Sequence, residues 1–81
     1  MRVVDIQVPV LDRIYDFELD EEREVGDLMK EIVSLIEEKE SLRPAREKKR
    51  YLYAIRRACV LKENERLAEQ GIRNGDRLIL I

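Results

Sequence analysis

The sequence predicts an α+β domain in which one helix packs on one face of a mixed five-stranded sheet. Three observations carry this prediction. Two early segments alternate apolar and polar residues, one later segment repeats apolar residues at helical spacing, and three short apolar segments follow. A single amphipathic helix has one apolar stripe, and a sheet is the surface that buries it. The length of 81 residues fits one domain over residues 1–81.

The first two strands are predicted from alternation with a period of two residues. In residues 2–8, the apolar residues that share one face are Val4, Ile6 and Val8. In residues 13–19, the corresponding side chains are Tyr15, Phe17 and Leu19. Residues 9–12 form the connecting turn, because Pro9 cannot donate to a β-ladder. The two segments therefore predict an antiparallel hairpin.

The spacing then changes to that of a helix. The apolar residues that recur at intervals of three and four are Val25, Leu28, Met29, Ile32, Leu35 and Ile36. They predict one amphipathic helix of about 15 residues. The acidic residues 20–24 precede it, where the helix dipole favours negative charge. No Ser or Thr N-cap with a capping box marks its start, and Pro44 indicates that it has ended by that point.

The second half of the chain supplies three more strands. We assign residues 41–50 to a loop, and residues 51–55, 58–61 and 77–81 to strands. Between them, the apolar anchors of a closing loop with one helical turn are Leu67, Ala68 and Ile72. Asn74-Gly75 predicts a tight turn, because glycine accepts positive φ. The order is therefore β-β-α-β-β-β.

The composition is that of a soluble domain with a highly charged surface, at 42% charged residues and a net charge of −2. No apolar segment approaches the roughly 20 residues of a membrane span, so we expect no membrane insertion. Residues 1–41 carry 5 basic and 13 acidic residues (−8), and residues 42–81 carry 11 and 5 (+6). Cys59 is the only cysteine and cannot form an internal disulfide. It predicts a reducing, cytoplasmic location and a buried, inert thiol.

The order of elements, with the ending "LAEQGIRNGDRLIL", resembles the ubiquitin-like β-grasp fold. The positions that carry the likeness are Leu67, Gly71-Ile72, Asn74-Gly75-Asp76, Leu78 and Leu80. Within that superfamily the chain is most similar to the YukD/EsaB-like proteins of bacterial type VII secretion. The matching stretches are "IYDFEL" at 14–19, "RPARE" at 43–47 and "GIRNGDRL" at 71–78. The resemblance implies an accessory component that contacts the membrane-embedded machine or its ATPase without catalysis of its own.

Conjugation and catalysis are not expected. Ubiquitin and sulfur carriers react through a flexible Gly-Gly tail, whereas this sequence ends at Leu80-Ile81 within the last predicted strand. Two alternatives stay open: a soluble N-terminal domain of a larger secretion membrane protein, and a modifier whose Gly-Gly tail is missing from this sequence. The chain has no His, the commonest general base. Residues 20–24 lack the spacing of an EF-hand loop. We expect no enzyme activity, no cofactor and no metal site.

A protein-binding face is predicted on the side of the sheet that the helix leaves uncovered. Alternation places five apolar or aromatic residues there: Ile14, Tyr51, Tyr53, Ile79 and Ile81. For the third strand the alternative is Leu52 and Ala54 outward, and we favour the tyrosines. The basic residues expected at the rim are Arg46, Lys48, Lys49 and Arg50. Exposed clusters of this kind mark protein contacts, although single exposed apolar residues are common. The partner is a secretion-apparatus component or ATPase, and a second copy of the chain is a further candidate.

Nucleic acid is the weaker interpretation of the basic segment. Basic residues between positions 43 and 57 flank Tyr51 and Tyr53, and such a pattern can bind phosphates and stack bases. The domain is net acidic, however, whereas a nucleic-acid-binding domain is usually clearly basic.

Overall fold

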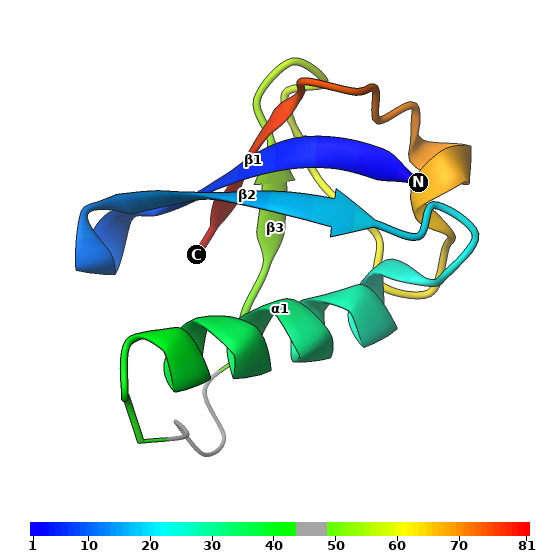
Figure 1. Cartoon of the computed structure of the whole chain (residues 1–81). Helices are drawn as coiled ribbons and strands as arrows, with labels where there is room; N and C mark the ends of the chain where they lie inside the picture. Colours follow the sequence, from blue (N-terminus) through cyan, green and yellow to red (C-terminus); the bar gives the residue numbers. More distant parts are fainter. Residues whose placement is uncertain (44–48) are drawn as a thin grey trace.

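Five strands and one α-helix form the α+β arrangement that the sequence predicts (Figure 1). The structure is a computed structural model that describes residues 1–43 and 49–81. The strands are β1 (Arg2–Val8), β2 (Arg13–Leu19), β3 (Leu52–Ala54), β4 (Cys59–Val60) and β5 (Arg77–Leu80). The helix α1 spans Val25–Lys39, and two short 3₁₀ helices are Pro9–Leu11 and Leu67–Gln70. The predicted order and the predicted hairpin bounds are confirmed.

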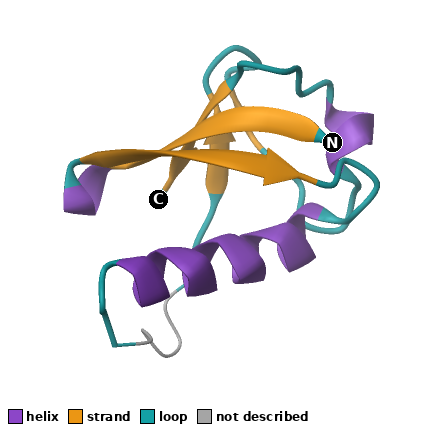
Figure 2. Ribbon diagram, in the orientation of Figure 1, coloured by secondary structure: helices purple, strands orange, loops and turns teal. Residues whose placement is uncertain are grey.

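The sheet is mixed, with the strand order β2-β1-β5-β3-β4. Among the described strands, only β1 and β5 run parallel, and the other neighbouring strands are antiparallel. The parallel pair lies at the centre of the sheet, and the long connection between its strands includes α1, as a parallel pair requires a crossover. In Figure 2, α1 lies along one side of this sheet. The chain thus separates a helix-covered face from a second face that α1 does not reach.

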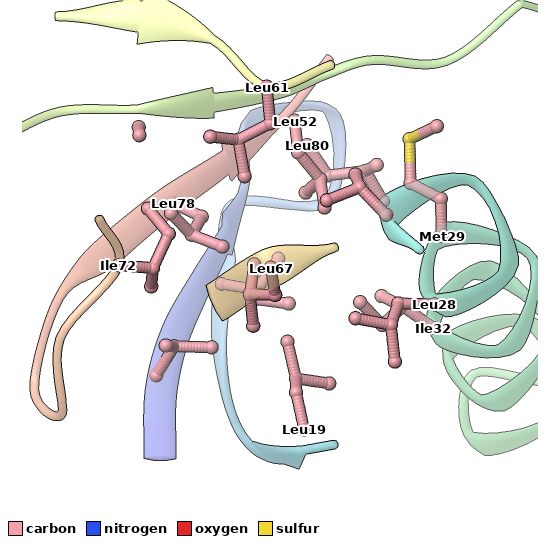
Figure 3. Packing of buried hydrophobic residues seen from close by; sticks show 14 of the residues in the cluster. Leu19, Leu28, Met29, Ile32, Leu52, Leu61, Leu67, Ile72, Leu78 and Leu80 are labelled. Atoms are coloured by element: carbon pink, nitrogen blue, oxygen red, sulfur yellow. The ribbon is translucent and has the colours of Figure 1, made fainter. Parts of the chain in front are cut away.

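The core lies between α1 and the sheet, and the alternation predicted for β1 and β2 fills it. The largest fully buried side chains are Ile6, Ile32, Leu52, Leu67, Leu78, Val4 and Val25. Figure 3 shows leucines from the strands and the closing loop converging on Leu28, Met29 and Ile32 of the helix. Tyr15 and Leu19 are buried, as predicted, and Phe17 packs partly against the cluster.

Leu35 was predicted to belong to the helix core, and the structure contradicts this because its side chain is 47% exposed. At about 100° per residue, Leu35 lies roughly 80° from Val25 around the helix, at the margin of the apolar stripe. Ile36 lies near the centre of the stripe and is buried. Spacing of three and four residues alone does not separate the centre of a stripe from its margin.

The first turn of α1 is capped by distant main-chain carbonyl groups. No side chain caps Glu24 at the N-cap position. Instead, the N–H of Val25 donates to the carbonyl of Glu65 (3.0 Å), and the N–H of Gly26 donates to the carbonyl of Glu63 (2.9 Å). These bonds satisfy donors that a helix leaves free at its start. A Cβ at Gly26 would lie 3.2 Å from the Glu63 carbonyl oxygen, so glycine allows the close approach.

Two small residues lie outside the core, contrary to prediction. Cys59 is exposed, because β4 has only two residues and forms the end of the sheet. Ala68 is also exposed, whereas Leu67 and Ile72 beside it are buried. The closing loop is therefore anchored by two apolar residues and not three.

Arg56 holds the turn before β5 against the turn after β3. Its Nε and Nη2 atoms donate to the two carboxylate oxygens of Asp76 at 2.8 and 2.9 Å, and it also donates to the carbonyl of Gly71. The hydrogen bonds from Arg56 lower the pKa of Asp76, and burial opposes them. This ion pair fixes the start of β5 beside β3, the two strands that carry the centre of the candidate site.

Candidate protein-docking face

A continuous row of side chains crosses all five strands on the face away from α1. Strand register pairs Ile14 with Gln7, Gln7 with Ile79, Ile79 with Tyr53, and Tyr53 with Val60. We call these five residues the cross-strand row. Four of them are apolar or aromatic. At about 4.8 Å between strands, the row is roughly 19 Å long.

The row is open at both ends and half-buried in the middle. Ile14 is 50% exposed and Val60 is 48% exposed, while Tyr53 and Ile79 are of intermediate exposure. The predicted outward orientation of the tyrosines is confirmed, because Leu52 and Ala54 are buried on the helix side. Central residues are thus positioned by their neighbours yet accessible, which is the arrangement expected of a contact surface.

Tyr51 and Ile81 lie beside the middle of the row, two residues along the chain from Tyr53 and Ile79. Their main chains exchange hydrogen bonds, from the N–H of Tyr51 to the carbonyl of Ile81 (3.0 Å) and back (2.9 Å). Both side chains are exposed, Tyr51 at 44% and Ile81 at 60%. The structure therefore brings Ile14, Ile79, Tyr53, Ile81 and Tyr51, the five predicted residues, onto one face.

A charged row runs beside the cross-strand row. Register pairs Asp5 with Asp16 on one side and with Arg77 on the other, and Arg77 Nη2 lies 3.6 Å from Asp5 Oδ2. The N–H of Asp5 donates to the carbonyl of Asp76, the residue just before β5, so the main chain of Asp5 faces the β5 side and not β2. Asp5 and Asp16 therefore form a non-hydrogen-bonded pair, in which side chains approach more closely.

This closeness changes the chemistry of Asp16. A side-chain hydrogen bond with Asp5 and the charge of Asp5 raise the pKa of Asp16, because a proton between two carboxylates relieves their repulsion. The charged row thus carries two carboxylates and one guanidinium, that of Arg77 beside Asp5, and has an excess of negative charge. Sequence reasoning missed Gln7, Val60 and this carboxylate pair, because each depends on strand register.

The two described residues of the predicted basic rim, Lys49 and Arg50, both line a groove of about 600 Å³ against α1, with Met29 and Val33. Lys49 donates to both carboxylate oxygens of Glu63 at 3.0 and 2.8 Å, and its Nζ lies 5.6 Å from the Tyr51 ring centroid. The hydrogen bonds with Glu63 raise the pKa of Lys49. Arg46 and Lys48 lie outside the described residues.

Two properties of the described residues bear on membranes and metals. No helix among them has the length and apolar character needed to cross a bilayer. Within the same residues, no group of three or more Cys, Asp or Glu side chains is arranged to hold a metal ion.

The model of YukD, a protein of the WXG100 protein secretion system (Wss), matches residues 3–80. The chain belongs to the YukD family. This membership confirms the likeness to the small YukD/EsaB-type proteins of type VII secretion. No match was found among curated proteins.

Solved structures confirm the ubiquitin-like fold of this YukD-family chain. The EccD5 ubiquitin-like domain from Mycobacterium xenopi superposes with a TM-score of 0.78 at 22% identity, over 99% of this chain and 91% of that one. A ubiquitin-like domain of an Arabidopsis thaliana protein gives 0.73 at 20% identity, over 99% and 74%. A chain of the MycP5-free ESX-5 inner membrane complex gives 0.78 at 17% identity, over 99% of this chain and 20% of that one.

Proposed function

We propose that this YukD-family protein is an interaction module of a bacterial type VII secretion system that acts by binding, without catalysis or conjugation. It works in the cytoplasm as an accessory component. Its cross-strand row docks onto a protein of the secretion apparatus, either a membrane-complex component or the ATPase. The observation that carries this proposal is the continuous row from Ile14 to Val60 on the face that α1 does not cover.

The row supports docking because the side chains at its centre are apolar or aromatic and are held in place by neighbouring strands. Tyr53 and Ile79 are paired in register and half-buried between neighbouring strands, so little side-chain freedom is lost when a partner covers them. A few residues near the centre of a contact, with Tyr among the most frequent, contribute most of the binding energy. The charged row beside them supplies orientation, because its carboxylates favour a cationic group on the partner.

The chemistry of the chain also favours binding over catalysis. The sequence has no His, and Cys59, its one thiol, lies in the two-residue strand β4. An exposed thiol without a neighbouring base is a weak nucleophile. The shifted pKa values of Lys49 and Asp76 are explained by their ion pairs, and that of Asp16 by its contact with Asp5.

The test is a binding titration with the purified cytoplasmic domain of the type VII secretion ATPase from the same organism, and in parallel with the detergent-solubilised membrane complex. Tyr53→Asp and Ile79→Asp are expected to weaken binding at least about tenfold, because each places a charge in the centre of the contact. Val10→Asp is the matched control, since Val10 is an exposed apolar residue in the turn between β1 and β2.

Folding of each variant is checked by amide NMR spectra. Equal affinity for the wild type and both Asp variants rejects this docking face. Sedimentation of the free protein examines the second-copy alternative, for which a dimer is expected to be lost in the same two variants.

A second candidate function is that of a ubiquitin-like domain within a larger secretion membrane protein. The observation that favours it is the structural likeness to the EccD5 domain and to a fifth of a chain in the ESX-5 inner membrane complex. The reading frame of the gene distinguishes the free module, the domain of a larger protein and the modifier. Apolar helices encoded after Ile81 support the larger protein, an encoded Gly-Gly end supports a modifier, and a stop codon supports the free module.

A further inference from the structure

Strand β2 forms a long open edge of the sheet. It is seven residues long and pairs only with β1, among the described strands. The opposite edge, β4, has two residues. An edge strand presents unpaired N–H and C=O groups that can accept another strand, and β2 is the edge with the length to do so.

Main-chain hydrogen bonds identify which groups of β2 point outward. Asp5 donates to the Asp76 carbonyl, and the Val3 carbonyl accepts from Gly75, so residues 3 and 5 face β5. Alternation along β1 then turns the main-chain N–H and C=O groups of Val4 and Ile6 toward β2, where these residues pair with Phe17 and Tyr15. The main-chain groups of three β2 residues therefore point away from the sheet: Ile14, Asp16 and Glu18.

A groove runs beside this edge. It has a volume of about 630 Å³ and lies between β2 and the last turns of α1. Tyr15 and Phe17 line it from the strand, and Leu35 and Ile36 line it from the helix. In Figure 1, β2 is drawn between β1 and α1, so a strand added to β2 would lie along this groove. Alternate side chains of that strand would face Leu35, which is exposed at the margin of the apolar stripe of α1.

The charge around the groove selects a basic occupant. Its lining includes Asp16, Glu38 and one cation, Lys39, whose Nζ lies 5.5 Å from the Tyr15 ring centroid. Asp16 already lies opposite Asp5. A Lys or Arg on an added strand would be attracted to these carboxylates.

A second copy of the chain is a poor occupant. Antiparallel pairing of two β2 strands about Asp16 places Asp16 opposite Asp16, and like charges directly opposite each other destabilise a sheet. Pairing about Tyr15 places Ile14 opposite Asp16, which leaves the carboxylate without a cation. The edge therefore disfavours itself and favours a strand of opposite charge.

We propose that the free edge of β2 is a second binding site, which takes an extended segment of a protein partner with alternating apolar and basic residues as a sixth strand. The segment's main chain pairs with Ile14, Asp16 and Glu18, and its apolar side chains enter the groove beside Leu35. This mode of recognition draws affinity from main-chain hydrogen bonds and specificity from alternate side chains. The site is separate from the centre of the cross-strand row.

The test is selection of a phage-displayed library of random twelve-residue peptides on the purified full chain, followed by titration of the enriched peptides in synthetic form. Alternating apolar and Lys/Arg residues are expected to be enriched. Asp16→Pro is expected to weaken these peptides at least about tenfold, because it removes an outward N–H while leaving the ladder to β1 in place. Asp16→Asn keeps that N–H, so it is expected to weaken them only a few-fold, and only at low salt.

Three further measurements test the same site on β2. Leu35→Lys, at an exposed position, is expected to lower affinity at least about tenfold even if Asp16→Pro does not fold. In amide exchange, Ile14, Asp16 and Glu18 are expected to gain protection with peptide. Tyr53→Asp is expected to leave peptide binding unchanged, which separates this site from the proposed docking face. Failure to enrich any peptide, enrichment of acidic peptides, or equal binding to Leu35→Lys overturns the proposal.

Discussion

Asp5 and Asp16 place two carboxylates side by side on the uncovered face of the sheet. Alternation in the sequence puts both residues on that face, but it does not show that they lie opposite each other. The register of β1 and β2 decides this, and the turn between them sets the register through the left-handed φ of 52° at Asp12. Sequence patterns therefore predict which face a charged residue occupies more readily than which neighbour it meets.

Asp16→Asn is expected to stabilise the fold at neutral pH. The pKa of Asp16 in the folded state is raised above its ordinary value of 3.8 by Asp5. A raised folded-state pKa gives stability that is complete below the unfolded-state pKa and is lost as pH rises through the folded-state value. Removing the carboxylate should therefore raise the free energy of unfolding at pH 7, and the gain should vanish below about pH 4.

Urea unfolding of the wild type and the variant across this pH range measures the effect. Glu18→Gln is the matched control, because Glu18 lies opposite Val3 and not opposite a carboxylate. A gain for Asp16→Asn that persists at pH 3, or an equal gain for Glu18→Gln, contradicts this account.

In the helix α1, the periodicity of apolar residues predicts some features and misses others. The helix bounds and the five buried positions follow from spacing. The exposure of Leu35, at the margin of the stripe, does not follow from spacing, because burial there depends on how far β2 extends over the helix. The start of the helix is also unpredictable from local sequence, since its N–H groups bind the carbonyls of Glu63 and Glu65, some 40 residues along the chain.

Ile32→Ala and Leu35→Ala are expected to differ sharply although both remove apolar atoms from one helix. Ile32 is 1% exposed, within the core. Its truncation should lower the free energy of unfolding by about 2–5 kcal/mol. Leu35→Ala should cost less than about 1 kcal/mol, because much of that side chain already contacts water. Chemical denaturation monitored by circular dichroism measures both values, and similar losses would show that Leu35 is a core residue.

At the scale of the whole molecule, the sequence predicted the fold class, the strand order along the chain and the orientation of Tyr51, Tyr53 and Ile79. The YukD-family match over residues 3–80 confirms the resemblance. The predicted basic rim stays a prediction. Among the described residues, Lys49 is paired with Glu63, and Lys49 and Arg50 both line the groove against α1, a placement that strand alternation alone does not predict.

In this protein, α1 shields one face of the sheet and leaves the other open to a partner. Methyl NMR of the isoleucines, with a soluble gadolinium chelate as a paramagnetic probe, tests it most directly. Ile14 and Ile81 are expected to broaden strongly and Ile79 to an intermediate degree, while Ile6 and Ile32 stay sharp. Protection of Ile14 and Ile79 equal to that of Ile6 would show that the face is covered, and would contradict the docking account.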